Sequence, residues 1–366
     1  MATRSIVPFF GRAWFLQITP TKGPNANKPI MISTDNFGYE ALRVEFEIVQ
    51  LAFANYWEAE FIIYNADGTI PDTNVSLYDA VIQEGDDIAF GAGYQADVPL
   101  GALPPIIWDG YIFYTTQDRV DVVDKRLIIR CLLNRVIPNF IDGTLPALST
   151  QFTQARFIGE NSSSPINVDQ NMWEQSTKTV INARGAIQLP RAKTFFGGSG
   201  HYLTALADQN NLLSWSDKHG WKTASLQNDS LGPIVGTYLP LAILDGPPRR
   251  EGKVSYSLIG QPQQTIYGVD FRVLLDPSIQ ITTPLSQVIV QKQYVRQAPI
   301  NFPLGKEDYT VPRPLNQYDQ YVVVGVKFVG DTRGNPWYTE VTGIANVLDM
   351  IQMMGETKAA DPNHSG

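Results

Sequence analysis

The segment YVVVGVKFVGDTRGNPWYTEVTG, residues 321–343, consists of two strand-like runs on either side of a short polar loop. Nearly every residue of 321–329 is apolar, which is typical of a strand in the middle of a sheet. Residues 337–343 predict a returning strand, and the glycines and the aspartate of 330–335 are typical of a turn. The segment therefore predicts a β-hairpin rather than an active-site loop.

The loop of this hairpin contains the residues that would otherwise suggest chemistry. Asp331 can accept a backbone N–H as in an Asx turn, and it can also pair with Arg333 across the loop. Pro336 lacks an N–H and suits the first residue of the returning strand, just before Trp337. Rigid loops at the ends of barrels are also good contact surfaces. Asp331, Arg333 and Trp337 are therefore predicted to be structural or interface residues.

Strict alternation extends the β pattern towards the N-terminus. In LRVEFEI, residues 42–48, apolar residues alternate with Arg43, Glu45 and Glu47, as in a half-buried antiparallel strand. WEAEFIIYN, residues 57–65, is its expected partner and ends in a turn sequence. Glu45 and Glu47 are candidates for a polar tube face, and the alternative is that they simply meet outside solvent.

The same patterns divide the chain into four parts. Further strands are expected near 87–94, 108–115 and 119–134, so residues 1–138 are predicted to form the first β domain. Residues 139–231 predict a mixed α/β domain, with helical stretches at 147–158 and after Ser199 and a hairpin over 215–226. Residues 232–344 return to a β pattern, most clearly in YGVDFRVLL from Tyr267. Residues 345–366 predict a C-terminal helix and a flexible tail.

Composition agrees with a β-rich, multi-domain chain. The 366 residues include 43% hydrophobic and only 17% charged residues, against about 25% charged in an average soluble protein. The 29 glycines and 25 prolines indicate frequent turns. A net charge of −8 disfavours a nucleic-acid grip, which needs clustered cations. The only cysteine, Cys131, falls on the apolar side of a strand pattern and excludes an intrachain disulfide.

Motifs for catalysis, cofactors or metals are weak. GGSGH, residues 197–201, lacks the second glycine of a nucleophile elbow around Ser199 and the lysine of a P-loop. Three histidines and one cysteine provide no zinc ligand set. Glu58 and Glu60 alternate on the polar face of an ordinary strand. The sequence therefore predicts no catalytic, cofactor-binding or metal-binding residue, and it predicts a protein that is not an enzyme. No run of about 18 apolar residues suggests a membrane anchor.

Several of these blocks together resemble a known family. GVDFRVLLDPSI, residues 268–279, followed by the 321–343 segment, resembles the C-terminal part of phage tail baseplate hub proteins. RVEFEIVQLAFANYWEAEFIIYN, residues 43–65, is similar to their first strand pair. The likeness covers about two-thirds of the chain in scattered blocks and is weakest over 140–230.

The resemblance implies a mainly β fold with two tube-like antiparallel β-barrel domains flanking the mixed α/β region. It implies a homotrimeric structural virion protein that joins a six-fold tail tube to a three-fold spike and lines part of the DNA ejection channel. The implied partners are the tail spike, tail tube and tape measure proteins and baseplate wedge or ring proteins, with non-specific passage of DNA only. The implied location is the virion tail baseplate, assembled in the host cytoplasm.

Two alternatives from other classes stay open at this level. A receptor- or carbohydrate-binding β module of a phage tail would use some of the 7 tryptophans and 16 tyrosines to stack on sugars. A β-sandwich hydrolase would use loop carboxylates. The first predicts saturable sugar binding by a monomer, and the second predicts turnover that one or two carboxylate substitutions abolish.

Overall fold

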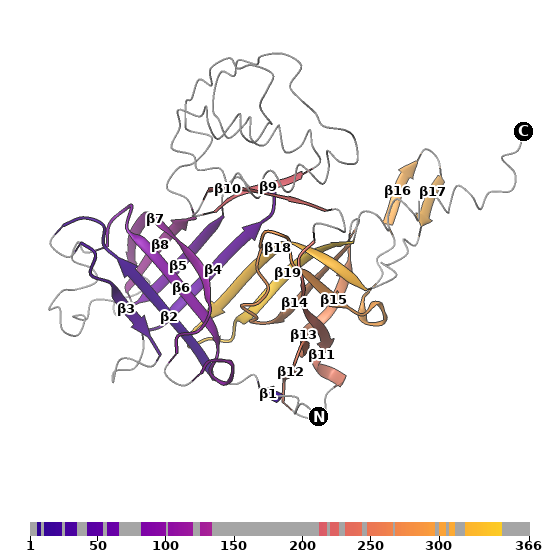
Figure 1. The fold of residues 1–366 in the computed structure, drawn as a ribbon, viewed down its shortest axis with the longest axis horizontal. Coiled ribbons are helices and arrows are strands. Elements are labelled where there is room, and N and C mark those ends of the chain that lie inside the picture. Colours follow the sequence, from indigo (N-terminus) through magenta and orange to yellow (C-terminus); the bar gives the residue numbers. More distant parts are fainter. Residues whose placement is uncertain are drawn as a thin grey trace, which may run out of the picture.

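In the computed structural model, most of the described residues belong to two large groups of β-strands. The described residues are 6–8, 11–133 and 212–345, except 24–25, 35–41, 54–56, 66–81, 100–101, 120–124, 218–219, 227–230, 244–246, 266–267, 297–299, 305–306 and 312–318. Within these ranges the regular structure is almost entirely β, with only short 3-10 helices. The prediction of a mainly β chain is therefore confirmed (Figure 1).

Strands from the first third of the chain form one antiparallel sheet, here called the N-terminal sheet. Its strand order is β4-β5-β8-β7-β6-β2-β3. The strands are β2 (Arg12–Thr19), β3 (Ile30–Ser33), β4 (Val44–Leu51), β5 (Glu58–Tyr64), β6 (Asp87–Tyr94), β7 (Ile106–Arg119) and β8 (Lys125–Leu132). The predicted pairing of the strands at 42–48 and 57–65 is confirmed, with Phe46 opposite Phe61.

Strands from the last third close into a six-stranded ring, here called the C-terminal barrel. The ring runs β11-β13-β14-β19-β18-β15 and back to β11. Its strands are β11 (Ile234–Pro240), β13 (Val254–Gln264), β14 (Gly268–Leu274), β15 (Gln287–Val290), β18 (Gln320–Asp331) and β19 (Trp337–Ala345). The predicted hairpin over 321–343 is confirmed as β18–β19, with Gly330 opposite Trp337.

The barrel departs from the expected antiparallel pattern in one respect. β11 runs parallel to both of its neighbours, β13 and β15. Parallel neighbours need a crossover connection rather than a tight turn, and alternation within a strand carries no information on its direction. The short strands β1 (Ile6–Pro8) and β12 (Arg249–Glu251) extend the sheet beyond β13.

The two arrangements are parts of one sheet. β4 of the N-terminal sheet pairs with β18 of the barrel, in antiparallel register from Leu51↔Gly325 to Glu45↔Asp331. Figure 1 shows the two units side by side along this seam, with the N-terminal strands in indigo and magenta and the barrel in orange and yellow. Because β4 joins β18, the N-terminal strands form no closed ring among the described residues. A barrel in the first unit stays a prediction.

The interior follows the alternation that the sequence predicts. Phe46, Ile48, Phe61, Ile129 and Phe328 are all buried and belong to one hydrophobic cluster that continues through both units. Their neighbours along each strand lie on the opposite, more exposed face. Cys131 is buried in this cluster as predicted, and burial raises the pKa of its thiol.

The middle of the chain is described only in part. The predicted hairpin is present as β9 (Leu212–Asp217) paired with β10 (Gly220–Ser225), and Trp215 packs into the common core. The predicted helices at 147–158, after Ser199 and at 345–354 lie outside the described residues, apart from Ala345 at the end of β19. The mixed α/β domain and the domain boundaries stay predictions. No described helix is long and apolar enough to cross a membrane.

Candidate functional site

The carboxylate of Asp331 stabilises the β18–β19 loop. This loop contains most of the residues that the sequence analysis singled out. Asp331 is only 5% exposed although it ends β18. Its Oδ1 accepts the backbone N–H of Arg333 at 2.9 Å, which is the expected Asx turn. Arg43 donates from Nε to Oδ1 at 3.2 Å and from Nη2 to Oδ2 at 2.8 Å. The sequence analysis did not predict this bidentate ion pair between Arg43 and Asp331, which lie 288 positions apart in the chain.

These contacts also set the protonation state of Asp331. Burial raises the pKa of the carboxyl, but the hydrogen bonds from Arg43 and from the backbone N–H groups of Arg333 and Gly334 outweigh it. The net effect holds the pKa of Asp331 below its usual range, so the group stays ionised at neutral pH. A carboxylate held in this way is a poor proton acceptor and a good structural anchor.

Arg12, on β2, holds the same loop from another side. Its guanidinium donates to the backbone carbonyl oxygens of Asp331, Gly334 and Asn335. It also lies over the ring of Trp337, 5.1 Å from the centroid. The loop is thereby joined to β2 as well as to β4. These strands are far apart in the order of the N-terminal sheet, in which β4 is the first strand and β2 is the last but one.

Trp337 contributes to the core rather than to an exposed contact surface. It is 4% exposed and meets Phe46 edge-to-face, with ring centroids 5.4 Å apart. Gly330 makes this packing possible, because a Cβ there would approach the Phe46 ring to 2.2 Å. Trp337 is thus available for a structural role but not, in this chain alone, for direct contact with a partner.

The two glutamates of β4 have different surroundings. Glu45 accepts hydrogen bonds from Arg43 Nη2 at 2.7 Å and from the Tyr64 hydroxyl at 3.0 Å, so it belongs to the Asp331 cluster. Glu47 lies further along β4 and forms an ion pair with Lys327 on β18, at 2.7 Å. Its side chain is 52% exposed. The structure therefore brings together Asp331, Arg333, Trp337 and Glu45, while Glu47 is part of a wider charged face.

That face, here called the outer face, crosses the seam between the two units. Ion pairs connect adjacent strands along it: Arg272 with Glu340, Lys327 with Glu47, and Arg130 with Glu60. Carboxylates outnumber cations on its strands β14, β19, β18, β4, β5 and β8. The carboxylates are Asp270, Glu340, Asp331, Glu45, Glu47, Glu58 and Glu60, and the cations are Arg272, Lys327, Arg126, Arg130 and, directly before β4, Arg43.

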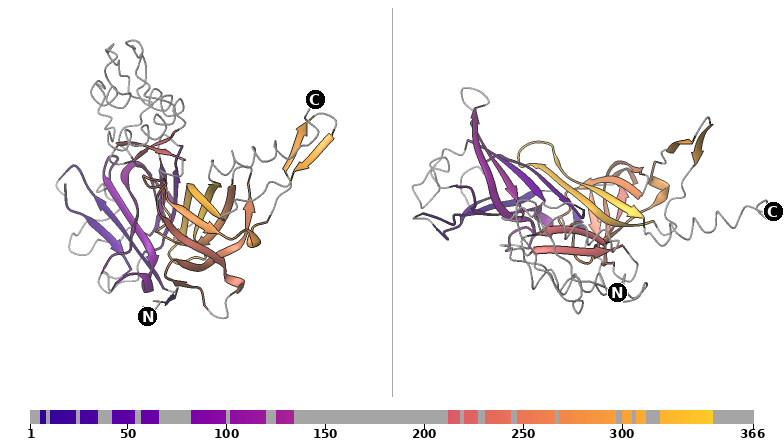
Figure 2. Two further views of the ribbon diagram at one scale, coloured as in Figure 1. Left: turned by 45° about the vertical axis from the view of Figure 1, so that its right-hand side comes forward. Right: turned by 90° about the horizontal axis from the view of Figure 1, so that it is seen from above.

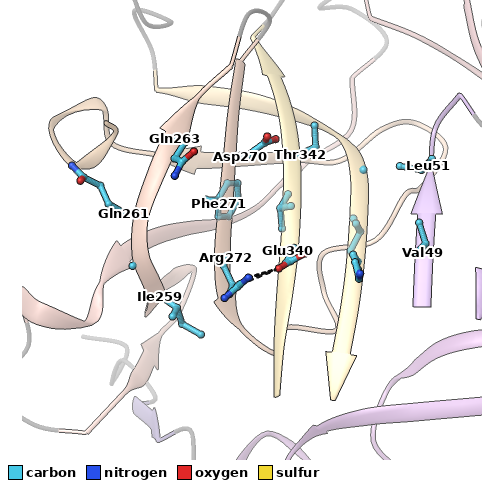
Figure 3. Close-up of a pocket in the computed structure, with 15 residues that line it drawn as sticks. Val49, Leu51, Ile259, Gln261, Gln263, Asp270, Phe271, Arg272, Glu340 and Thr342 are labelled. Carbon is cyan, nitrogen blue, oxygen red and sulfur yellow. Dashed lines mark hydrogen bonds and ion pairs between the residues drawn. The ribbon is translucent and has the colours of Figure 1, made fainter. Parts of the chain in front are cut away.

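A groove of about 580 Å³ hollows the outer face where the barrel meets β4 (Figure 3). Val49 and Leu51 line it from β4, and polar residues of β13, β14 and β19 line it from the barrel. The bulge in β13 between Ile259 and Gln263 opens this space, with Gly260 at a positive φ of 71°. The Arg272–Glu340 pair crosses its floor. The lining also includes the side-chain amides of Gln261 and Gln263 and the carboxyl group of Asp270.

A second buried polar cluster lies in the barrel and was missed by sequence reasoning. Asp276 is 2% exposed and accepts hydrogen bonds from the Tyr238 hydroxyl at 2.8 Å, from Arg250, and from the backbone N–H of Ser278 at 3.0 Å. Asp276-Pro277 was visible in the sequence only as a strand end. No group of three or more metal-ligating side chains occurs among the described residues.

Comparison with known proteins gives structural neighbours only. No family model matches the chain, and no curated protein matches it. A tail protein from Neisseria meningitidis aligns with 10% identity and a TM-score of 0.47, covering 92% of this chain and 97% of the other. A 43 kDa prophage tail protein from Shewanella oneidensis aligns with 12% identity and a TM-score of 0.41, covering 92% and 99%.

A third neighbour is an E. coli component of the type VI secretion system, with 9% identity, a TM-score of 0.45, and coverage of 85% of this chain and 75% of the other. The structural neighbours are thus phage tail and secretion-system proteins. With TM-scores below 0.5 and identities near 10%, these likenesses do not themselves support a function, which must be argued from the geometry of this chain.

Proposed function

We propose that this chain is a structural subunit of a phage tail: a trimeric baseplate hub between a six-fold tube and a three-fold spike. The observation that carries the proposal is the β4–β18 ladder, which joins two β units of one chain into a single sheet. Three such chains present six β units in a ring, which provides three-fold and approximate six-fold symmetry in one assembly. The resemblance of residues 43–65, 268–279 and 321–343 to hub proteins supports the same role.

In this proposal the outer face lines the channel. Three ion pairs between adjacent strands engage six of its charged residues, and the excess of carboxylates gives it a negative balance. A surface of this kind repels phosphates and offers no cation cluster for DNA to hold. Asp331, Arg333, Trp337 and Glu45 then have a structural role, which is to hold the β18–β19 loop against β2 and β4.

The first experiment measures the mass of the assembly. The chain is purified alone and together with the spike protein of the same tail, and each sample is examined by light scattering and native mass spectrometry. We expect a trimer of this chain, alone or on the spike. A chain that stays monomeric in both samples contradicts the proposal.

The second experiment tests the channel. Glu47→Lys adds one cation per chain to the outer face and leaves Lys327 without its carboxylate partner. We expect the assembled variant to bind DNA in a salt-dependent manner, while the unmodified assembly does not. Glu84→Lys makes the same charge change in an exposed loop before β6 and serves as the control. Equal DNA binding by both variants would place the outer face outside the channel.

A further inference from the structure

The groove on the outer face is built into the main chain of the strands that line it. Gly325 lines it without a side chain, at the register shift in β18, and a Cβ there would crowd Leu51 and Thr342, each at 3.2 Å. On the other wall the bulge of β13 leaves Gly260 and Gln261 exposed. The volume of about 580 Å³ lies within the range of about 300–1,000 Å³ that is usual for binding sites.

The charges beside the groove are balanced. Arg272 lies opposite Glu340 and forms an ion pair with it, and its guanidinium also lies over the Tyr338 ring, 4.4 Å from the centroid. Lys327 forms its ion pair with Glu47 across the seam. Both cations that line the groove are therefore engaged by groups of this chain.

One carboxylate in the groove differs from the others. Asp270 is exposed and lies opposite two neutral residues, Gln263 on β13 and Thr342 on β19 (Figure 3). Among the described residues no cation forms an ion pair with it. Arg296 is bridged to Gln263 on the far side and does not line the groove. Asp270 thus offers a negative charge that a cationic ligand can neutralise.

The width of the groove indicates a ligand larger than one side chain. Asp270 lies on β14 and Leu51 on β4, and β19 and β18 lie between these strands. Figure 2 shows this order in its right-hand view, with yellow strands between the orange barrel strands and the indigo N-terminal strands. At about 4.8 Å per strand, three steps span about 14 Å. An extended peptide of about four residues, at about 3.3 Å each, covers this distance.

The rest of the lining also suits a peptide. Val49 and Leu51 offer half-buried apolar side chains at one end of the groove. The amides of Gln261 and Gln263 and the hydroxyl of Thr342 can donate and accept hydrogen bonds with a peptide main chain. A single unpaired carboxylate matches one cationic side chain, whereas a polyamine carries several charges. A phosphate would be repelled.

We propose that the groove binds an extended segment of another tail protein, with an arginine or lysine side chain at Asp270 and an apolar side chain against Val49 and Leu51. The choice of a different protein rests on the proposed function, because an outer face that lines the channel is not covered by neighbouring copies. Recognition of the peptide needs no trimer, since every lining residue belongs to one chain.

Peptide binding by the purified chain tests the recognition. The probes are capped hexapeptides, Gly-Leu-Ser-Ser-Arg-Gly and the same residues in reverse order, each compared with an analogue in which citrulline replaces arginine. Citrulline keeps the shape of arginine without its charge. We expect saturation-transfer NMR to show binding of the arginine form in one order, weakening as salt is added. The citrulline form should bind at least about fivefold more weakly, which corresponds to about 1 kcal/mol.

Matched neutralisations locate the site. Asp270→Asn removes the carboxylate of the groove, and Glu84→Gln removes one from the exposed loop before β6, so the two variants have the same net charge. We expect only Asp270→Asn to lose the preference for arginine over citrulline. Thr342→Phe fills the groove without a change of charge and should weaken binding of both forms. All three positions are exposed, so the melting temperatures should stay close to that of the unmodified chain.

Cross-linking in assembled tails identifies the partner. Gln261→Cys places a thiol on the exposed wall of the groove, where a benzophenone maleimide can be attached, while the native Cys131 is buried. Irradiation should link the groove to a different tail protein, beside a lysine or arginine of that protein. Adding Asp270→Lys should abolish this link, and adding Glu84→Lys should leave it in place.

The outcomes separate this inference from the proposed function. Equal binding of the arginine and citrulline forms, no binding of either, or the same behaviour of Asp270→Asn and Glu84→Gln overturns the peptide site and leaves the trimer untouched. Spermidine that displaces the peptide at equal concentration also overturns it, in favour of free polyamines. Links only to copies of this chain overturn the choice of partner. If the arginine peptide binds as expected but the chain stays monomeric with its spike, the peptide site stands and the trimeric hub fails.

Discussion

Replacing Asp331 by asparagine tests how the β18–β19 loop is held. The substitution keeps the shape of the side chain and an oxygen that can still accept the Arg333 N–H. It removes the negative charge that receives two hydrogen bonds from Arg43. The change therefore isolates the ion pair from the turn.

The expected cost follows from the surroundings of the pair. A hydrogen bond to a charged group contributes about 1.5–3 kcal/mol. The Arg43 side chain is 41% exposed, so water screens the attraction, and it retains Glu45 as a second partner at 2.7 Å. The Asp331 side chain is only 7% exposed, so its lost contacts are poorly replaced by water. We expect Asp331→Asn to lower the free energy of unfolding by about 1–2 kcal/mol.

Urea unfolding followed by tryptophan fluorescence measures this difference, with Glu340→Gln as the control. Glu340 forms its ion pair with Arg272 on the outer face, where the two side chains are 35% and 47% exposed, both more than a third. Such a pair contributes less than about 1 kcal/mol. We expect the control to unfold close to the unmodified protein.

The pH dependence gives an independent check. Folding lowers the pKa of Asp331, so its stabilisation is present above the pKa of the unfolded chain and is lost as the pH falls through the folded pKa. The gap between the unmodified protein and Asp331→Asn should thus narrow below about pH 4. Asp331→Asn and Glu340→Gln with equal stabilities at pH 7, or a gap that widens in acid, would refute the reasoning.

Three further substitutions probe other sites. Tyr238→Phe removes a buried hydroxyl that donates to Asp276 at 2.8 Å, and we expect it to lower the free energy of unfolding in urea by about 1–2 kcal/mol. An unchanged free energy of unfolding would show that this hydrogen bond makes no net contribution to stability. Gly334→Ala places a Cβ 1.9 Å from an Asp331 oxygen. We expect it to lower the melting temperature and to reduce the free energy of unfolding by about 1–3 kcal/mol. An unchanged melting temperature would mean that the loop adjusts to the extra atom without loss of stability. Asp97→Asn should stabilise the protein at pH 7 by less than about 1 kcal/mol, because burial and then the nearby carboxylate of Asp276 raise the pKa of Asp97 and make its charged form unfavourable. This gain should disappear as the pH falls and Asp97 takes up a proton in the folded protein, and a gain that grows in acid would contradict it.

Local sequence determined the strands and the central hairpin. Alternation over 42–48 and 57–65 predicted two paired strands, and the glycines and Asp331 between 321–329 and 337–343 predicted the turn that joins β18 to β19. Such features depend on neighbours within a few residues, where side-chain period and turn chemistry act directly. The buried position of Cys131 followed from the same alternation.

Tertiary structure alone decided which strands meet across long distances. β4 joins β18, and β11 closes the barrel through parallel ladders, although no strand pattern names its partner or its direction. For the same reason the sequence offered Arg333 as a possible partner of Asp331, while the fold supplies Arg43 from 288 residues away. The fold also gives Glu45 and Glu47 different surroundings, although the two residues occupy equivalent positions in the alternating sequence pattern. Glu45 accepts hydrogen bonds from Arg43 and Tyr64, whereas Glu47 forms an ion pair with Lys327. The partners differ because the two glutamates occupy different positions in the β4–β18 register.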